Sequence, residues 1–545
     1  MLFSSIQLRF GYFLLFTLGL TACLNKSQQL VSPLSPLLQD PLIKSYFNQS
    51  QASSYTEVLR QQTRLGDNLE EIIVNTIADA NSTVYVAVQE LRLPAIAQAL
   101  AERYQAGIKV RVIIENIYNR PWESLNPSEA AQLSQQERDR YNDFFSLIDY
   151  NIDGNISQDE INLRDALIIL SNAEVPLIDD TADGSKGSGL MHHKFVIVDG
   201  KTIIVTSANF TTSGIHGDFS EPLSRGNANS LLKIESFELA ELFTKEFNIL
   251  WGDGPGGQPD SKFGVNKPFR GTRQVLVGDT KVAVQFSPTS NSQSWQESVN
   301  GLINKTLEKA QTSINLSLFV FSEQLLVNTL ENKSLQGVLI QGLIDPSFAY
   351  RYYSEGLDMM GIALANKCKY ETNNRIWKKP ISTVGLPNLP PGDRLHHKFG
   401  VIDNSIVITG SQNWTKAANK NNDETLLIIE NSTVAAHFDR EFQRLYQTAT
   451  MGIPSWLMKK VEKQQQECGD RLIETETLVI DTNNKINLNT ATAEELEILP
   501  GVGPKLAERI IQARKNKPFA SLADLDQVSG IGPKMLDKLS DRVTW

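Results

Sequence analysis

Two stretches of the chain carry the same spaced set of side chains that suit phosphoryl chemistry. The first stretch runs over 192–211 and the second over 396–415. In each, one residue separates a His from a Lys, and four residues separate that Lys from an Asp. Six residues then lead to a Thr-Ser pair in the first stretch and a Gly-Ser pair in the second, and one residue separates the Ser from an Asn. The sets are His192, Lys194, Asp199, Ser207 and Asn209, and His396, Lys398, Asp403, Ser411 and Asn413.

The spacing predicts a pocket for a phosphate group. Alternate residues of a strand face the same side, so the His and the Lys of each set project together. Two such sets facing one another would offer two imidazoles and two ammonium groups to a tetrahedral anion flanked by a nucleophile and an acid. Neither set holds carboxylates or cysteines at metal-ligand spacing, so no catalytic metal or other cofactor is implied. His193 and His397 point to the opposite strand face, where we expect structural roles.

The elements around the two sets are also repeated. Each unit shows a strand, a helix, an apolar β-rich segment, a second helix and a further strand. The first unit spans about 41–250 and the second about 281–447, and a Gly- and Pro-rich linker over 251–280 joins them. Strands that alternate with helices predict an α/β fold, here two tandem repeats that form one pseudo-two-fold catalytic unit.

The paired motif resembles that of the phospholipase D superfamily over residues 41–447. The resemblance implies that one histidine attacks phosphorus and forms a phosphohistidine. It implies that the other histidine protonates the leaving alcohol and then activates water. It also implies that Lys194, Lys398, Asn209 and Asn413 hold the phosphoryl oxygens.

Family members often place a carboxylate downstream of the Asn to orient each histidine, and here the two repeats differ. Glu424 lies eleven residues after Asn413, whereas Asn229 occupies the corresponding place in the first repeat. A carboxylate beside an imidazole favours the charged ring, and an amide orients the ring without that bias. We therefore expect Glu424 to keep His396 protonated as the acid, and neutral His192 to be the nucleophile. The alternative is that both rings have other partners.

An insertion in the first repeat has the pattern of a calcium-binding loop. Residues 149–160 read DYNIDGNISQDE and fit D-x-[DN]-x-[DN]-G-x5-E in full, between two helical patterns. These oxygen-bearing positions can surround Ca²⁺ in a structural or regulatory role. The expected ligands are Asp149, Asn151, Asp153, the Asn155 carbonyl, Ser157 and Glu160.

Residues 486–545 form a separate small all-α module after a linker over 448–485. The letters PGVGPK over 500–505 recur as SGIGPK over 529–534, where glycines end one helix and a proline begins the next. This resembles the tandem helix-hairpin-helix module of bacterial competence and repair proteins, which binds the DNA backbone; a protein-association module is the alternative. The expected backbone contacts are Gly501, Gly503, Lys505, Gly530, Gly532 and Lys534.

Residues 1–23 are typical of an export signal. A positive charge precedes an apolar segment too short to span a membrane, and the signal ends in the letters LTAC. This resembles the bacterial lipobox, which implies lipidation of Cys23 and an exported lipoprotein of the cell envelope facing the periplasm or the exterior; a plain signal peptide is the alternative. Export implies an oxidising compartment, in which Cys368 and Cys468 could pair.

The composition leaves two main classes of function. Hydrophobic residues make up 41% and charged residues 21%, as in ordinary globular proteins. The net charge of −10 is not that of a general nucleic-acid binder, but it does not exclude a local DNA site. The C-terminal module favours a DNA-cleaving phosphodiesterase. The lipid anchor favours a phospholipase D acting on membrane phospholipids, and the intact motifs argue against a third alternative, a catalytically silent DNA-uptake tether.

Overall fold

The structure is a computed structural model. It describes residues 33–122, 129, 132–133, 135–185, 189–371, 373–469, 486–496, 499, 502–532, 535–536, 539 and 542–545. The predicted signal over 1–23, with Cys23, lies outside the described residues, as do residues 470–485 of the second linker. None of the helices in the described part is long and apolar enough to cross a bilayer.

The first repeat is built on a mixed seven-stranded sheet in the order β1-β9-β8-β7-β4-β5-β6. Only β4, β5 and β6 pair in parallel. The strands are β1 (Ile43–Phe47), β4 (Thr83–Val88), β5 (Lys109–Ile114), β6 (Leu177–Asp179), β7 (Lys194–Val198), β8 (Thr202–Thr206) and β9 (Ser230–Glu235). The helices are α2 (Leu69–Ala78), α3 (Pro94–Gln105), α5 (Gln135–Ile148), α6 (Gln158–Arg164), α7 (Ala166–Asn172), α8 (Thr212–Ile215) and α9 (Phe237–Trp251).

The second repeat has a nine-stranded sheet in the order β10-β11-β19-β17-β16-β12-β14-β15-β20. Its seven central strands follow the order of the first sheet, and β10 and β20 extend the edges. The strands are β10 (Arg273–Val277), β11 (Thr280–Phe286), β12 (Ser313–Leu318), β14 (Leu339–Ile344), β15 (Val384–Leu386), β16 (Lys398–Ile402), β17 (Ile406–Gly410), β19 (Thr425–Glu430) and β20 (Thr450–Met451). The helices are α10 (Val299–Leu307), α11 (Gln324–Leu335), α12 (Pro346–Ala349), α13 (Glu355–Met359), α14 (Lys416–Lys420), α15 (Ser432–Tyr446) and α16 (Ser455–Cys468).

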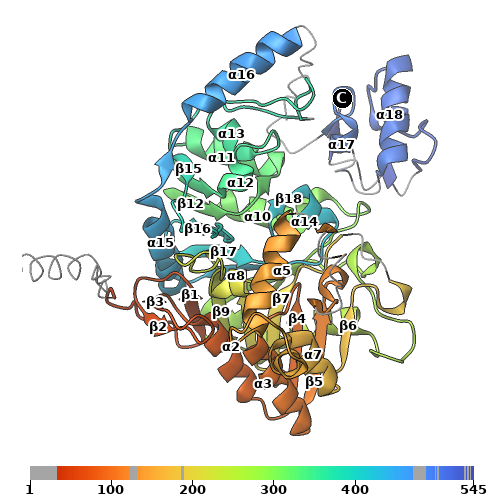
Figure 1. Ribbon diagram of the computed structural model, residues 1–545. Helices are drawn as coiled ribbons and strands as arrows, with labels where there is room; N and C mark the ends of the chain where they lie inside the picture. Colours follow the sequence, from red (N-terminus) through yellow and green to blue (C-terminus); the bar gives the residue numbers. More distant parts are fainter. Residues whose placement is uncertain are drawn as a thin grey trace, which may run out of the picture.

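Helices α9 and α15 join the two sheets into one unit, which confirms the predicted pair of α/β repeats. Figure 1 shows the first repeat, red to yellow, below the second, green to blue. Helix α9 packs on β4, β7 and β8 and also touches β10 of the other repeat, while α15 packs on β12, β16 and β17 and touches β1. Phe243 and Phe438, each with an apolar neighbour four residues on, belong to one buried cluster that crosses the junction. Burying such a ring stabilises the fold by about 1.5–3 kcal/mol.

The outer faces of the sheets carry separate apolar clusters. Helices α2 and α3 cover the first sheet, and α10 and α11 cover the second. The central strands are therefore buried on both faces, which explains their continuous apolar letters. Beyond the second sheet, Cys368 and Cys468 form a disulfide with a Cα–Cα distance of 5.5 Å, which ties the end of α16 to the loop after α13.

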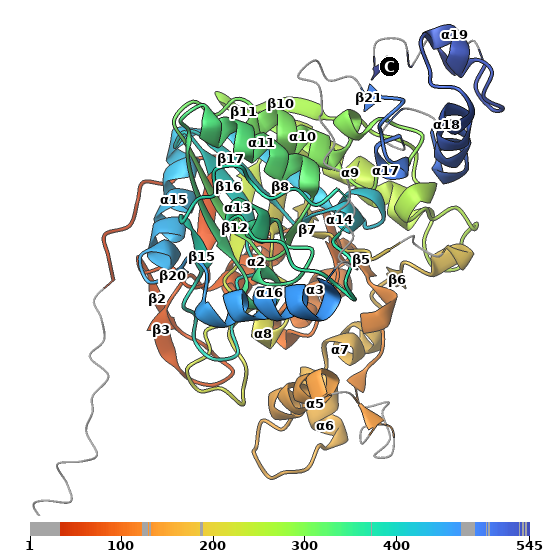
Figure 2. The same cartoon turned by 90° about the horizontal axis from the view of Figure 1, so that it is seen from above.

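The insertion and the C-terminal module have the predicted helices. Helices α5 and α6 flank the loop over 149–160 and stand out from the first repeat (Figure 2). The C-terminal module contains α17 (Ala493–Leu496), α18 (Pro504–Asn516) and α19 (Leu522–Leu525) around its own apolar cluster. The module is not all-α as predicted, because β21 (Ile486–Asn487) pairs in parallel with β22 (Val543–Thr544).

Candidate active site at the junction of the repeats

Each motif histidine is held in place by the backbone of the other repeat. The His192 N–H donates to the Asp423 carbonyl at 3.0 Å, and the His396 N–H donates to the Ala228 carbonyl at 3.1 Å. Short parallel bridges, Met191 with Asp423 and Ala228 with Leu395, flank these bonds. The repeats thus exchange contacts at the ends of β7 and β16 and bring both motifs to one site, where the charges of Lys194 and Lys398 act on both histidines.

The side-chain partners of the two histidines also come from the opposite repeat. His192 Nδ1 lies 2.7 Å from Glu424 Oε2, and His396 Nδ1 lies 3.0 Å from Asn229 Oδ1. The prediction that Glu424 lies beside His396 is therefore wrong. Glu424 lies between Asp423 and the first residue of β19. Because the Asp423 carbonyl accepts the His192 N–H, this crossed backbone contact places the neighbouring carboxylate beside the first repeat's ring.

Asn229 is oriented so that only its oxygen can face His396. Its Nδ2 donates to the carbonyls of Gly214 at 2.7 Å and Asn227 at 3.0 Å. Its Oδ1 accepts from Ser207 Oγ at 2.7 Å as well as from the His396 ring. His396 must therefore carry its proton on Nδ1 when neutral, which directs Nε2 away from Asn229.

The pair of His192 and Glu424 is buried, with 8% and 0% of the side chains exposed. Burial lowers the pKa of His192 well below its usual value, and the neighbouring Lys194 and Lys398 act in the same direction. Burial also raises the pKa of Glu424 to about 7. Near neutral pH the pair therefore holds at most one negative charge, with a proton shared between ring and carboxylate.

The two lysines lie beside the histidines on the same strand face. Lys194 Nζ donates to the His192 carbonyl at 2.9 Å, and Lys398 Nζ donates to the His396 carbonyl at 2.7 Å. Burial lowers the pKa of Lys194 to about 7. Burial and the nearby Lys194 lower the pKa of Lys398 well below its usual value. A site that crowds buried cations in this way favours an anion, which would restore their protonation.

The serine and asparagine of each motif divide into two roles. Ser207 and Ser411 accept backbone N–H bonds at 3.0 and 2.9 Å from the first residues of β9 and β19, so they fix the strand ends. Asn209 and Asn413 instead have buried Oδ1 atoms without a hydrogen-bond partner in the described part of the chain. Because an amide oxygen can only accept, an anionic ligand would have to be bound by the Nδ2 groups of these asparagines.

Asp199 and Asp403 do not reach the pocket, and their assignment to the catalytic set needs correction. The Asp199 carboxylate accepts backbone N–H bonds of 2.7–2.9 Å from residues 81–83, and Asp403 accepts equivalent bonds of 2.8–2.9 Å from residues 311–313. Partial burial acts to raise the pKa of Asp199, but these bonds prevail and lower it to about 2. Both aspartates follow the ends of β7 and β16 opposite the histidines, where they brace the turns before β4 and β12.

The second histidine of each pair is structural, as predicted. His193 and His397 are fully buried. His193 Nε2 faces Glu246 of α9 at 3.4 Å, and His397 Nε2 faces Glu441 of α15 at 3.0 Å. These contacts attach the motif strands to the junction helices.

Two acidic residues that the sequence analysis did not single out fix the backbone next to the motif histidines, one beside each. Glu115 Oε2 accepts from the Met191 N–H at 2.6 Å, and Asp345 Oδ2 accepts from the Leu395 N–H at 2.8 Å. Burial raises the pKa of Glu115 to about 7. A signal was present in the sequence, because the strands β5 and β14 are each followed directly by an acid.

The remaining predicted sites lie away from this pocket. In the calcium-type loop, Asp149 accepts the Gly154 N–H at 3.0 Å and Glu160 accepts the Ser157 N–H at 2.9 Å. Across the described ranges, no three His, Cys, Asp or Glu side chains gather closely enough to hold a metal ion. The other expected oxygen donors, Asn151, Asp153 and Asn155, lie in the same loop between α5 and α6.

The expected DNA contacts lie partly outside the described residues. Gly501 and Lys534 fall there, whereas Gly503 caps the start of α18 and Lys505 is exposed on it. The remaining two glycines lie in the turn after α19: Gly530 has φ +102°, and Gly532 follows two residues on.

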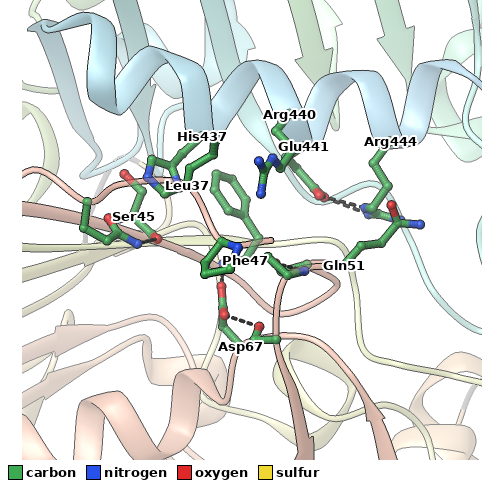
Figure 3. A pocket seen from close by; sticks show the side chains of 14 residues that line it. Leu37, Ser45, Phe47, Gln51, Asp67, His437, Arg440, Glu441 and Arg444 are labelled. Atoms are coloured by element: carbon green, nitrogen blue, oxygen red, sulfur yellow. Dashed lines mark hydrogen bonds and ion pairs between the residues drawn. The ribbon is translucent and has the colours of Figure 1, made fainter. Parts of the chain in front are cut away.

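A separate hollow of about 140 Å³ lies between β1 and α15 (Figure 3). Phe47, Asp67, His437, Arg440 and Arg444 are among its lining residues, and none of the motif residues is. Asp67 is engaged by the Phe47 N–H at 2.7 Å and by Ser53 Oγ. The hollow is therefore distinct from the pocket at the junction.

Known protein families match the two parts of the chain separately. A family described as "Cardiolipin synthase, PLD-like domain" matches residues 73–251 and 303–446, and the "Helix-hairpin-helix motif" matches residues 481–544. The first match covers both repeats with their motifs, and the second covers the C-terminal module.

Individual relatives are similar over part of the chain. The mitochondrial cardiolipin hydrolase of Homo sapiens is 28% identical over 151 residues, which are 28% of this chain and 52% of that protein. A phospholipase D of Rickettsia felis is 27% identical over 181 residues, which are 33% of this chain and 70% of that protein. The chain spans 52–58% of the length of three cardiolipin hydrolases that it matches.

Two solved structures are also similar. Phosphatidylserine synthase of Haemophilus influenzae aligns with a TM-score of 0.46 at 12% identity, over 81% of this chain and 96% of that one. Nuc from Salmonella typhimurium, a phospholipase D family member, aligns with a TM-score of 0.26 at 23% identity, over 32% of this chain and 100% of that one.

Proposed function

The chain belongs to the PLD-like domain family and is a phosphodiesterase of the phospholipase D superfamily, and we propose that it hydrolyses DNA through a phosphohistidine on His192. The observation that carries the choice of DNA is the helix-hairpin-helix motif on the same chain as the pocket. The pocket supplies the chemistry, and the module supplies the contact with the DNA backbone.

In the first step, His192 Nε2 attacks phosphorus and the P–O bond to the leaving group breaks. The Nδ1–H of His192 points to Glu424 Oε2 at 2.7 Å, so the carboxylate stabilises the positive charge that forms on the ring. Burial and the nearby Lys398 and Lys194 lower the pKa of His396 well below its usual value. The negative charge of a bound phosphodiester opposes that shift, so His396 takes up a proton with the substrate and then gives its Nε2 proton to the leaving oxygen. The proposed nucleophile is therefore the residue that the sequence favoured, but for a different reason. Glu424 supports His192 directly and does not keep His396 protonated.

In the second step, neutral His396 takes a proton from water as the water oxygen attacks phosphorus. The P–N bond breaks, the phosphate monoester leaves, and both histidines return to their starting states. Asn229 suits this exchange of roles, because its oxygen accepts the Nδ1–H in both protonation states of His396 and adds no charge of its own.

Lys194, Lys398, Asn209 and Asn413 hold the non-bridging oxygens in both steps. The two lysines lie beside the histidines, and the asparagines would bind these oxygens through their Nδ2 donors, since an amide oxygen can only accept. A bound phosphodiester would raise the depressed pKa values of both lysines, so that binding takes up protons.

The DNA assignment is tested by separating the module from the pocket. Removing residues 486–545 should weaken DNA binding and raise KM for long DNA, and should leave turnover of bis-p-nitrophenyl phosphate nearly unchanged. In the full chain, Lys505→Glu should flatten the dependence of log affinity on log salt concentration by about one unit of slope, because one phosphate contact is lost. Lys459→Glu, an exposed lysine on α16, is the charge-matched control and should leave the slope unchanged.

Phospholipid hydrolysis is the second candidate, because the similar proteins are named for cardiolipin and phospholipase D activity. Purified protein incubated with cardiolipin or phosphatidylcholine vesicles, and separately with plasmid DNA, distinguishes the two. Release of headgroup at a rate above DNA cleavage, with truncated and intact proteins binding DNA alike, would replace the nuclease assignment by a phospholipase D.

We also propose that the loop over 149–160 binds Ca²⁺ in a structural or regulatory role. Its donor set consists of carboxylate, amide, hydroxyl and carbonyl oxygens, which suits a hard cation. Glu160, the expected last ligand, is buried within the loop, and its Oε1 has no hydrogen-bond partner in the described part of the chain. The ion would be bound by Asp149, Asn151, Asp153, the Asn155 carbonyl, Ser157 and Glu160.

Export with lipidation at Cys23 is our proposal for the location of the protein. The disulfide between Cys368 and Cys468 supports it, because such bonds persist in oxidising compartments. Mass spectrometry of the mature N-terminus tests the proposal; an unmodified N-terminus that retains residues 1–22 would contradict it.

A further inference from the structure

The two sides of the pocket differ in the residue that follows the central strand of each sheet. Gln89 after β4 and Phe319 after β12 are equivalent, because their N–H groups donate to the carbonyls of His193 at 3.1 Å and His397 at 2.8 Å. The Phe319 ring lies edge-on to the His396 ring, with 4.8 Å between centroids. Gln89 instead offers its Oε1 to a lysine of the first repeat. At this position the site is therefore aromatic on the His396 side and polar on the His192 side.

A second ring extends this aromatic wall. Phe348 of α12 lies edge-on to Phe319, with 4.7 Å between ring centroids, and both rings are half-buried. Phe319 also faces Lys398, whose Nζ lies 4.8 Å from the ring centroid. Phe348 touches Phe319, so it extends the wall beside the reacting groups.

The equivalent position in the first repeat is covered. Tyr118 corresponds to Phe348, since both lie three residues after the acid that ends the preceding strand segment, Glu115 or Asp345. Arg140 of the inserted helix α5 lies over the Tyr118 ring at 5.8 Å and within 3.5 Å of its hydroxyl. Arg140 of the insertion thus covers the ring on the His192 side. The second repeat lacks this insertion beside its ring pair.

Positive charge lies beside the half-buried ring pair. Arg394 and Arg351 are exposed, and both donate to Ser347, the neighbour of Phe348 on α12. Half-exposed rings beside arginines are the elements that bind unpaired bases and their phosphates, because every base has a π-face and each linkage carries a charge. A base within a duplex has both faces stacked and cannot offer one to the ring.

We propose that the Phe319–Phe348 wall stacks the base of the departing nucleoside, which makes single-stranded nucleic acid the substrate class and Phe348 a specificity-determining residue. The proposal rests on the proposed function: His396 protonates the leaving oxygen, so the wall beside it faces the leaving group. The wall positions that group under the acid, and duplex DNA must be locally opened before it is cut.

The test uses full-length protein and short single strands in which methylphosphonate linkages leave one cleavable bond. Three strands are compared: one with both bases beside that bond, one abasic on the leaving side, and one abasic on the other side. Wild type should lose about ten-fold in kcat/KM on the leaving-side abasic strand only, a loss of ~1.4 kcal/mol and the scale of one base–aromatic stack. Duplex of the same sequence should be cut more slowly still.

Phe348→Ala should lose about ten-fold on the intact strand and lose nothing further on the leaving-side abasic strand. Phe348→Trp, which keeps an aromatic face, should restore the difference between the two strands. Tyr118→Ala is the matched control at the equivalent position and should respond to the abasic site as wild type does. A melting curve for each variant checks that the fold is retained.

Three outcomes would overturn the proposal while leaving nuclease activity in place. These are equal loss of Phe348→Ala on intact and abasic strands, wild type indifferent to the abasic site, and equal rates on duplex and single strand. If Phe348→Ala slows cardiolipin turnover and no strand is cleaved, the wall serves a lipid and the proposed function itself fails.

Discussion

The crossed pairing of Glu424 with His192 leads to a prediction that assigns the two histidine roles. Replacing Glu424 by Gln keeps the size of the side chain and removes its charge. The Nδ1 and Oε2 atoms are 2.7 Å apart and the pair is buried, so the lost charge lies against the ring that becomes positive. The step affected should be the attack on phosphorus, because His192 carries the developing charge in that step.

The size of the effect follows from the geometry. Charge centres about 4 Å apart interact by about 4 kcal/mol at an effective dielectric constant of about 20. With roughly half of the ring charge developed in the transition state, the loss is about 2 kcal/mol, which lowers the rate about 30-fold. Wild type should also gain activity as pH rises through about 7, because burial raises the pKa of Glu424 to about 7 and only its ionised form carries the charge that stabilises the positive ring.

The assay is stopped-flow release of p-nitrophenolate from bis-p-nitrophenyl phosphate. This leaving group needs no acid, so the burst reports the attack alone. Glu424→Gln should slow the burst about 30-fold and remove its rise with pH near 7. Asn229→Asp is the matched control at His396; it should leave the burst unchanged and raise the pH at which substrates with alkyl leaving groups lose activity.

The opposite pattern would refute the assignment. If Glu424→Gln leaves the nitrophenolate burst intact and impairs only substrates with alkyl leaving groups, then Glu424 supports the acid. His192 would then be the proton donor and His396 the nucleophile. Mass spectrometry of a trapped phosphoenzyme gives an independent result, because the adduct should lie on His192.

Three further predictions follow from the pocket and from the inserted loop. His192→Ala and His396→Ala should each lower kcat by several orders of magnitude on an alkyl phosphodiester, since neither repeat holds both roles, and one variant with most of its activity left would contradict a shared pocket. Sulfate affinity, measured by calorimetry, should fall as pH rises through about 7, because Lys194 then loses its proton; Lys194→Gln should show a weaker dependence. Ca²⁺ at about 100 times its Kd should raise stability by ~2.7 kcal/mol and EDTA should lower the melting temperature without stopping catalysis, whereas a wild type that melts as Glu160→Gln does, with or without Ca²⁺, would remove the calcium assignment.

The repeated motifs determined most of the fold and much of the site. A helix-strand pattern that recurs with its His and Lys at the same place predicts two equivalent sheets, and the seven central strands of each have the same order. Strand alternation alone placed His192 with Lys194 in the pocket and turned His193 toward α9. Such local rules depend on backbone geometry within a few residues, which a single sequence specifies.

Which groups meet across the junction depends on how the two repeats dock. Glu424 follows its own repeat's motif in sequence, yet it binds His192, because the carbonyl before it is bonded to the opposite repeat's backbone. Asp199 shares the motif's spacing with the histidine but lies at the other end of β7, where distance along a strand removes it from the pocket. Spacing along the chain shows which residues lie on the same helix or strand. Contacts between residues of different repeats depend on how the elements of the two repeats pack together, and the spacing of residues within one element does not show how that packing occurs.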